Sequence, residues 1–142
     1  MKLANKVLLI PYSPTSEDKD FFVRWVELLK PMHNLTKTEQ SVLAAILRSR
    51  HQLSKNVTDI NLLDEMCLNY SYRAKIIEFL YISSQQLNYI LSKIKDKGIL
   101  SPVLKINGRI DYFKINPIFI PNLIEEDKQY KVLLVFQSSD VK

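Results

Sequence analysis

The chain has 142 residues and a formal net charge of +5, and 46% of its residues are hydrophobic while 25% are charged. This composition is typical of one globular domain and excludes a disordered or fibrous chain. The two glycines, one cysteine and two histidines exclude Gly-rich phosphate loops and an internal disulfide, and they offer no cluster at zinc-ligand spacing, so we expect neither cofactor nor metal.

The positive charge is concentrated in one stretch of the chain. Between Ser71 and Lys114 there are eight basic and three acidic residues, which accounts for the whole net charge. We therefore expect this stretch to bind a polyanion.

The first predicted elements are a strand and a short helix. The apolar residues 6–12 favour a strand or an extended arm that is stopped by prolines. From Asp18 to Leu29 the aromatic and aliphatic residues recur at helical spacing. Ser16 or Asp18 is the expected N-cap of this helix, and Pro31 is expected to end the run.

The next predicted helix begins at a capping box. The Thr36 side chain is placed to accept the N3 amide, while the Glu39 carboxylate reaches back to the amide of the cap residue. An apolar stripe behind this box predicts an amphipathic helix that lasts to about Ser49.

Two shorter helices are predicted between residues 58 and 80. Thr58 and Asp59 supply the cap of a helix that carries the apolar residues of 60–66. Ser71 is the expected cap of a second helix over 72–80.

The most informative stretch is a helix predicted over 84–97. Ser83 and Gln86 form a second capping box, and apolar residues at i, i+3, i+4 and i+7 give the helix one buried face. Gly98 follows at the position of a left-handed C-cap. The other face carries amide, hydroxyl and lysine side chains, with no carboxylate before Asp96.

A β-hairpin is predicted directly after this helix. Residues 99–106 and 109–115 flank Asn107-Gly108, the pair that most strongly favours a two-residue type I′ turn. Lys105 and Arg109 are expected at the end of this hairpin, and two prolines then break up an extended segment.

A last β-strand is predicted over 130–137, so that a strand lies near each end of the chain. The two terminal strands are expected either to pair with each other or to add to the sheet edge of a partner. The second arrangement favours a homo-oligomer or an assembly with other proteins.

The order of these elements resembles the winged helix-turn-helix family over 35–115. In particular, LNYILSKIKDKGIL combines spaced apolar positions with a charged turn and Gly-Ile. The resemblance implies that 84–97 is the recognition helix and that 99–115 is the wing. The expected fold class is therefore mainly α with a small β component (α+β), a winged helix with extra terminal strands.

Three segments are expected on this basis. Residues 1–34 would form an N-terminal strand or arm and a short helix, residues 35–117 the winged-helix domain, and residues 118–142 a C-terminal extended segment and strand.

The predicted helix and hairpin have the chemistry of double-stranded DNA recognition. Amide and hydroxyl side chains can bond base edges in the major groove, and basic side chains can reach phosphates. An ordinary solvated helix face is the alternative interpretation of the same pattern. The expected DNA-binding residues are Ser84, Gln85, Gln86, Asn88, Tyr89, Ser92, Lys93, Lys95, Lys97, Lys105 and Arg109.

The whole chain is also similar to small proteins encoded by tailed bacteriophages, including crAss-like phages. The similarity lies in LTKTEQSVLAAILRSRHQLSKNVTDINLL, ISSQQLNYILSKIKDKGIL and KINPIFIPNL. It implies a phage-encoded protein, and a DNA-binding winged helix of this origin would be a regulator or replication accessory in the host cytoplasm. The alternative is a structural virion component, such as a head-tail neck or tail ring protein, that uses a winged-helix-like domain for assembly.

We do not expect an enzyme, because the sequence holds no recognisable set of nucleophile, base and metal ligands. Asp59, Asp64 and Glu65 lie close together at helical spacing, but a solvated helix face explains them better than a two-carboxylate site does. No apolar run approaches the roughly 18 residues that cross a bilayer, so we also expect no membrane partner.

Overall fold

The computed structural model describes residues 2–8, 18–121, 123–126 and 129–138, and it describes side chains from 21 to 121. The chain divides into two compact units. One is a sheet unit, Met1–Phe21 with Pro121–Lys142, and the other is a helical unit, Phe22–Ile120.

The sheet unit contains a three-stranded antiparallel sheet. β1 (Lys2–Leu8) pairs with β5 (Gln129–Ser138) along its whole length. β4 (Leu123–Glu126) pairs with the other side of β5, which gives the order β1-β5-β4. The expected pairing of the terminal strands with each other is therefore confirmed, although residues 9–12 of the predicted first strand lie outside the described residues.

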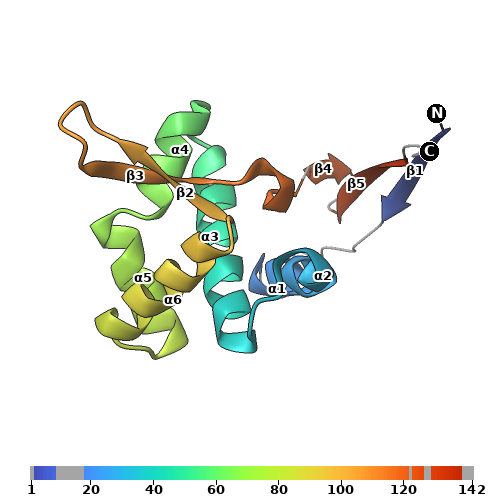
Figure 1. Cartoon of the computed structure of the whole chain (residues 1–142). Coiled ribbons are helices and arrows are strands. Elements are labelled where there is room, and N and C mark those ends of the chain that lie inside the picture. The colour runs from blue at the N-terminus through green and yellow to red at the C-terminus, as the bar shows by residue number, and fades with distance from the viewer. Residues whose placement is uncertain (1, 9–17, 122, 127–128, 139–142) are drawn as a thin grey trace. The chain divides into compact units, whose positions relative to one another are not determined.

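The helical unit is arranged around α3 (Lys37–Ser54), as Figure 1 shows. On one side of α3 lie α1 (Asp18–Leu28), which enters this unit at Phe22, and α2 (Lys30–His33). On the other side lie α5 (Tyr70–Leu80) and α6 (Ser84–Asp96). The remaining elements are α4 (Ile60–Cys67), the antiparallel strands β2 (Leu100–Leu104) and β3 (Ile110–Ile115), and the 3-10 helix η1 (Pro117–Phe119). The expectation of a mainly helical α+β protein is confirmed.

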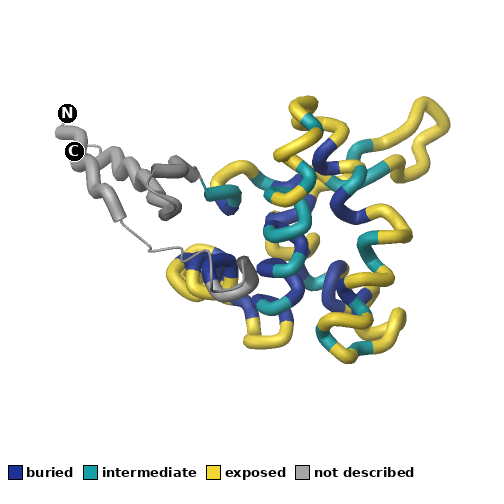
Figure 2. Tube along the Cα trace, turned by 180° about the vertical axis from the view of Figure 1, so that it is seen from behind, coloured by how far each residue is buried: buried dark blue, intermediate teal, exposed yellow. Residues whose placement is uncertain are grey.

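The core of the helical unit forms along α3. Val42, Leu43 and Ile46 are completely buried, and Figure 2 shows α3 as the most buried part of the unit. The predicted capping box starts the helix, because the Glu39 amide donates to Thr36 Oγ1 at 3.3 Å and the Thr36 amide donates to Glu39 Oε1 at 3.1 Å. The helix is longer than its apolar stripe predicts, because no residue between 50 and 54 breaks it.

One predicted helix end is confirmed and one predicted cap is wrong. The first helix ends at Leu28, one residue from the expected Leu29, and Pro31 lies in the first turn of the separate helix α2, where its missing amide donor costs nothing. Ser71 is not a cap, since α5 begins at Tyr70 and Asn69 Oδ1 accepts a hydrogen bond from the Tyr72 amide at 3.0 Å. Asparagine and serine are equally good caps, so the pattern alone did not separate the two positions.

The hairpin turn also differs from the prediction. Gly108 has a φ of 84°, but Asn107 has no positive φ, which a type I′ turn requires at both central residues. The Gly108 amide donates to Lys105 O at 2.9 Å and the Lys105 amide donates to Arg109 O at 2.7 Å. This pattern is that of a three-residue loop, a type I turn followed by a left-handed glycine, and it places Ile106 in the loop.

From Phe22 onward the first helix belongs to the helical unit. Trp25 is 2% exposed, and its indole Nε1 donates to the Phe119 carbonyl at 2.8 Å, 94 residues away along the chain. Phe22 and Val26 are buried as well. These side chains are part of the core of the helical unit, Phe22–Ile120.

Candidate nucleic-acid interface

α6 is an amphipathic helix with a fixed start. The Gln86 amide donates to Ser83 Oγ at 3.1 Å, and the Ser83 amide donates to Gln86 Oε1 at 2.8 Å, which confirms the second capping box. The side-chain oxygen of Gln86 is therefore engaged in the cap, and this bond does not use the two donors of its amide nitrogen. Gly98, with a φ of 78°, takes the expected left-handed conformation after the helix.

The two faces of α6 differ sharply in exposure. Leu87, Ile90, Leu91 and Ile94 are buried, and the helix contacts α3, α5 and β2. The predicted site residues that are exposed on this helix are Ser84, Gln85, Gln86, Asn88, Tyr89, Ser92 and Lys95. Asp96 is exposed too, and its spacing from Ser92 places it on the same face, one turn further toward the C-terminal end.

Lys93 has a restrained position on this face. Its Nζ lies 5.3 Å from the centre of the Tyr89 ring, and the side chain is half-buried. An ammonium over a tyrosine ring is attracted by the negative face of the ring, so Tyr89 holds the charge close to the helix surface. Lys95 is exposed.

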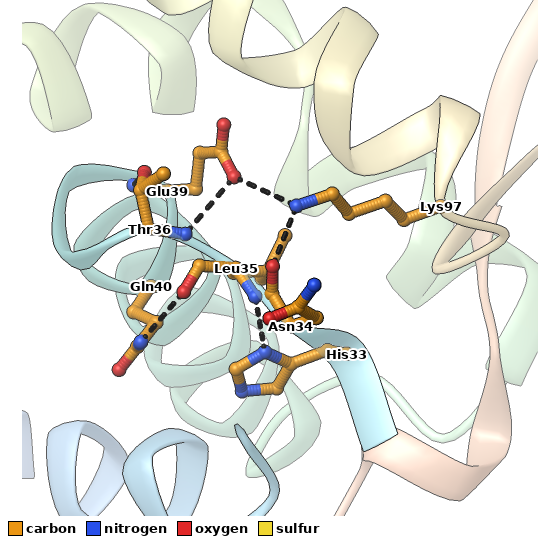
Figure 3. A network of polar contacts seen from close by, with 7 residues as sticks. All are labelled: His33, Asn34, Leu35, Thr36, Glu39, Gln40 and Lys97. Carbon is orange, nitrogen blue, oxygen red and sulfur yellow. Dashed lines mark hydrogen bonds and ion pairs between the residues drawn. The ribbon is translucent and has the colours of Figure 1, made fainter. Parts of the chain in front are cut away.

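Lys97 differs from the other predicted site residues. Its Nζ donates to the Asn34 carbonyl at 2.7 Å and to Glu39 Oε1 at 3.3 Å, so its charge joins the end of α6 to the start of α3 (Figure 3). The structure therefore does not bring Lys97 together with the other basic residues as a free cation. The ammonium already binds Asn34 and Glu39, so Lys97 is not among the expected phosphate contacts.

The Glu39 carboxylate joins the capping box to Lys97. Burial raises the pKa of Glu39, but the hydrogen bonds from the Thr36 amide and from Lys97, together with the charge of Lys97, outweigh burial and leave the pKa below its ordinary value. The same network is extended by the Gln40 side chain, which donates to the Leu35 carbonyl at 2.9 Å (Figure 3).

This lowered pKa predicts a loss of stability in acid. A carboxyl whose pKa is lowered by folding stabilises the folded state above its unfolded pKa, and that contribution is lost as the pH falls through the folded pKa. We expect Glu39→Gln to be less stable than the parent protein at neutral pH, with a difference that shrinks below about pH 4. Urea unfolding at several pH values, followed by the fluorescence of Trp25, the single tryptophan, measures this difference in the free energy of unfolding.

The exposed Glu65→Gln substitution on α4 is the control for this experiment. A difference between Glu39→Gln and the parent that is the same at every pH contradicts the assignment.

The end of the hairpin is exposed on both strands. Lys105 and Arg109 are exposed at the turn, as the sequence predicts, and the Asn107 side chain accepts a hydrogen bond from the Arg109 amide at 3.0 Å. Sequence reasoning missed the aliphatic side chains beside them. Leu104 is 58% exposed and Ile106 is 110% exposed. One sequence feature could have indicated this exposed cluster. Ile106 lies next to Asn107-Gly108, whereas turns normally carry polar or small residues.

The acidic residues of α4 do not form a paired-carboxylate site. Asp59 Oδ1 accepts hydrogen bonds from the Asn61 and Leu62 amides and so caps the helix. Asp64 is not on a solvated face as expected, because it is 1% exposed and forms an ion pair with Arg50 Nε at 2.8 Å.

Cys67 is a buried thiol beside this ion pair. Its Sγ contacts the Asp64 carbonyl at 3.4 Å. Burial, and then the neighbouring Asp64 carboxylate, raises the pKa of the Cys67 thiol to about 12, so the reactive thiolate is scarcely populated near neutral pH. Within residues 18–121 and the described strands, the structure shows no group of three side chains able to hold a metal ion.

No helix in the described part of the chain is long and apolar enough to cross a membrane. Comparison with protein-family models, with curated proteins and with solved structures finds no match to this chain.

Proposed function

We propose that α3, α5, α6 and the β2–β3 hairpin form a winged helix-turn-helix that binds double-stranded DNA. In this proposal α6 lies in the major groove and the hairpin is the wing. The protein would act as a regulator or replication accessory, encoded by a tailed phage. The observation that carries the proposal is the exposed amide, hydroxyl and lysine face of α6, followed at once by a hairpin with basic residues at its end.

The connection between α5 and α6 supports this proposal. The three residues 81–83 separate the helices, and Tyr81 takes a left-handed conformation with a φ of 55°. Its amide and that of Ile82 both donate to the Ile77 carbonyl, which closes the end of α5 in a tight turn. A turn of three to four residues is typical of the helix-turn-helix motif.

The distribution of charge along α6 indicates which part of it approaches DNA. Gln85 and Asn88 lie in the first half of the helix, where recognition helices contact base edges. Asp96 lies at the far end and would repel a phosphate. The N-terminal half of α6 is therefore the part expected to enter the groove.

The decisive experiment measures affinity for a generic duplex of about 30 base pairs across a salt series, with the mass in solution measured in parallel. Each phosphate contact contributes roughly −0.9 to the slope of log K against log salt. With Lys93, Lys95, Lys105 and Arg109 as contacts, we expect a slope of about −3 to −4.

Lys95 and Lys97 provide a matched pair for this experiment. Both are lysines at the end of α6, but only Lys97 has its ammonium engaged by Glu39 and Asn34. Lys95→Gln is expected to reduce the slope by about one, whereas Lys97→Gln leaves it unchanged. A slope for Lys95→Gln equal to that of the parent protein would exclude Lys95 as a phosphate contact.

The alternative of a virion structural protein gives a different result. It predicts no duplex affinity even at low salt, together with a defined higher-order mass in solution. That outcome would replace the DNA-binding proposal.

A further inference from the structure

The end of the β2–β3 hairpin combines exposed aliphatic side chains with basic ones. Leu104 and Ile110 lie opposite each other in the strand register and are 58% and 47% exposed. Ile106, in the loop between them, is 110% exposed. Lys105 and Arg109 flank the loop, and Figure 2 shows the whole end of the hairpin as exposed.

The turn holds Ile106 in a defined position. The Gly108 amide donates to the Lys105 carbonyl, the Lys105 amide donates to the Arg109 carbonyl, and the Arg109 amide donates to Asn107 Oδ1. Three hydrogen bonds across five residues leave little freedom to fold the isoleucine back onto the strands. Covering an exposed aliphatic side chain with a partner lowers the free energy, because apolar surface is removed from water. Exposed apolar clusters of this kind therefore mark interaction sites.

We propose that Ile106 is a wedge that enters the DNA minor groove and partly separates two stacked base pairs, which bends the duplex. This inference rests on the DNA-binding function proposed above. Proteins that kink DNA insert an aliphatic or aromatic side chain between base steps while nearby basic side chains contact the groove and its phosphates. The hairpin end offers both, with Ile106 as the apolar group and Lys105 and Arg109 as the cations.

The dimensions favour entry by the end of the hairpin alone. Paired strands lie about 4.8 Å apart before their side chains are counted, whereas the minor groove is about 6 Å wide. The two-stranded ribbon is therefore too wide to lie along an undistorted minor groove. A single side chain at the turn fits, and its insertion would widen the groove for Leu104 and Ile110 behind it.

The test uses the full chain and a duplex with a fluorescent donor and acceptor at its two ends, so that bending raises energy transfer. Ile106→Ser removes the wedge at a position where the side chain is fully exposed. Ile60→Ser is the matched control, because Ile60 on α4 is also exposed, at 63%. The parent protein and Ile60→Ser are expected to raise energy transfer on binding.

Ile106→Ser is expected to bind about tenfold more weakly, without the rise in energy transfer and with an unchanged salt slope, because no phosphate contact is lost. Binding by the parent protein with no bend, or an Ile106→Ser variant that bends DNA like the parent, overturns the wedge and leaves groove binding in place. A parent protein without duplex affinity overturns both proposals. Binding to phosphatidylserine vesicles but not to DNA, lost in Ile106→Ser, would instead identify a membrane-inserting hairpin.

Discussion

Replacing Lys93 and Arg109 together with glutamate is expected to lower the affinity for duplex DNA by roughly 100- to 1,000-fold. One residue lies on α6 and the other at the end of the hairpin, so the pair tests both parts of the proposed interface. Each reversal replaces an attraction to phosphate by a repulsion, and each elementary charge near phosphate is worth about 1 kcal/mol or more. The fold should persist, because neither side chain forms an ion pair among the described residues.

The matched control for this double variant is Arg24→Glu with Lys30→Glu. Both residues are exposed, and they lie on α1 and α2, across α3 from α6 in Figure 1. The control changes the net charge by the same amount, so it separates a local contact from a general effect of charge. Fluorescence anisotropy of a labelled duplex at low salt measures both, and equal losses of affinity would place the binding surface elsewhere.

The sequence best predicts those parts of the structure that depend on interactions between residues close together along the chain. Thr36 with Glu39 and Ser83 with Gln86 form capping boxes as their patterns indicate, because both partners lie within one helical turn. The buried stripe of α6 follows from periodicity for the same reason. The exposed face of that helix, and hence most of the candidate site, could be located without tertiary information.

The interactions that the sequence does not reveal join residues that are distant along the chain. Lys97 looks like its neighbour Lys95, but its partners Asn34 and Glu39 are 63 and 58 residues away. Whether a lysine is free to contact phosphate depends on such tertiary contacts, which periodicity does not report. The exposed state of Ile106 follows from a turn that places one more residue in the loop than Asn107-Gly108 suggests.

The buried ion pair between α3 and α4 leads to the largest expected effect on stability. Arg50 Nε donates to Asp64 Oδ1 at 2.8 Å, and the two side chains are 12% and 2% exposed. Arg50→Met removes the cation and leaves a buried carboxylate without its ion-pair partner. Breaking a buried pair in this way typically costs about 3 to 5 kcal/mol, because the remaining charge stays desolvated.

The double variant Arg50→Met with Asp64→Leu distinguishes an unpaired charge from lost packing. Replacing both partners by apolar groups removes the desolvated charge, so the double variant should regain most of the stability that Arg50→Met loses. Urea unfolding monitored by Trp25 fluorescence gives the free energies, with the exposed Arg24→Met as the control for removing an arginine. If the double variant is as unstable as Arg50→Met, the unpaired Asp64 carboxylate does not cause the loss of stability. Arg50 would then stabilise the fold through its packing.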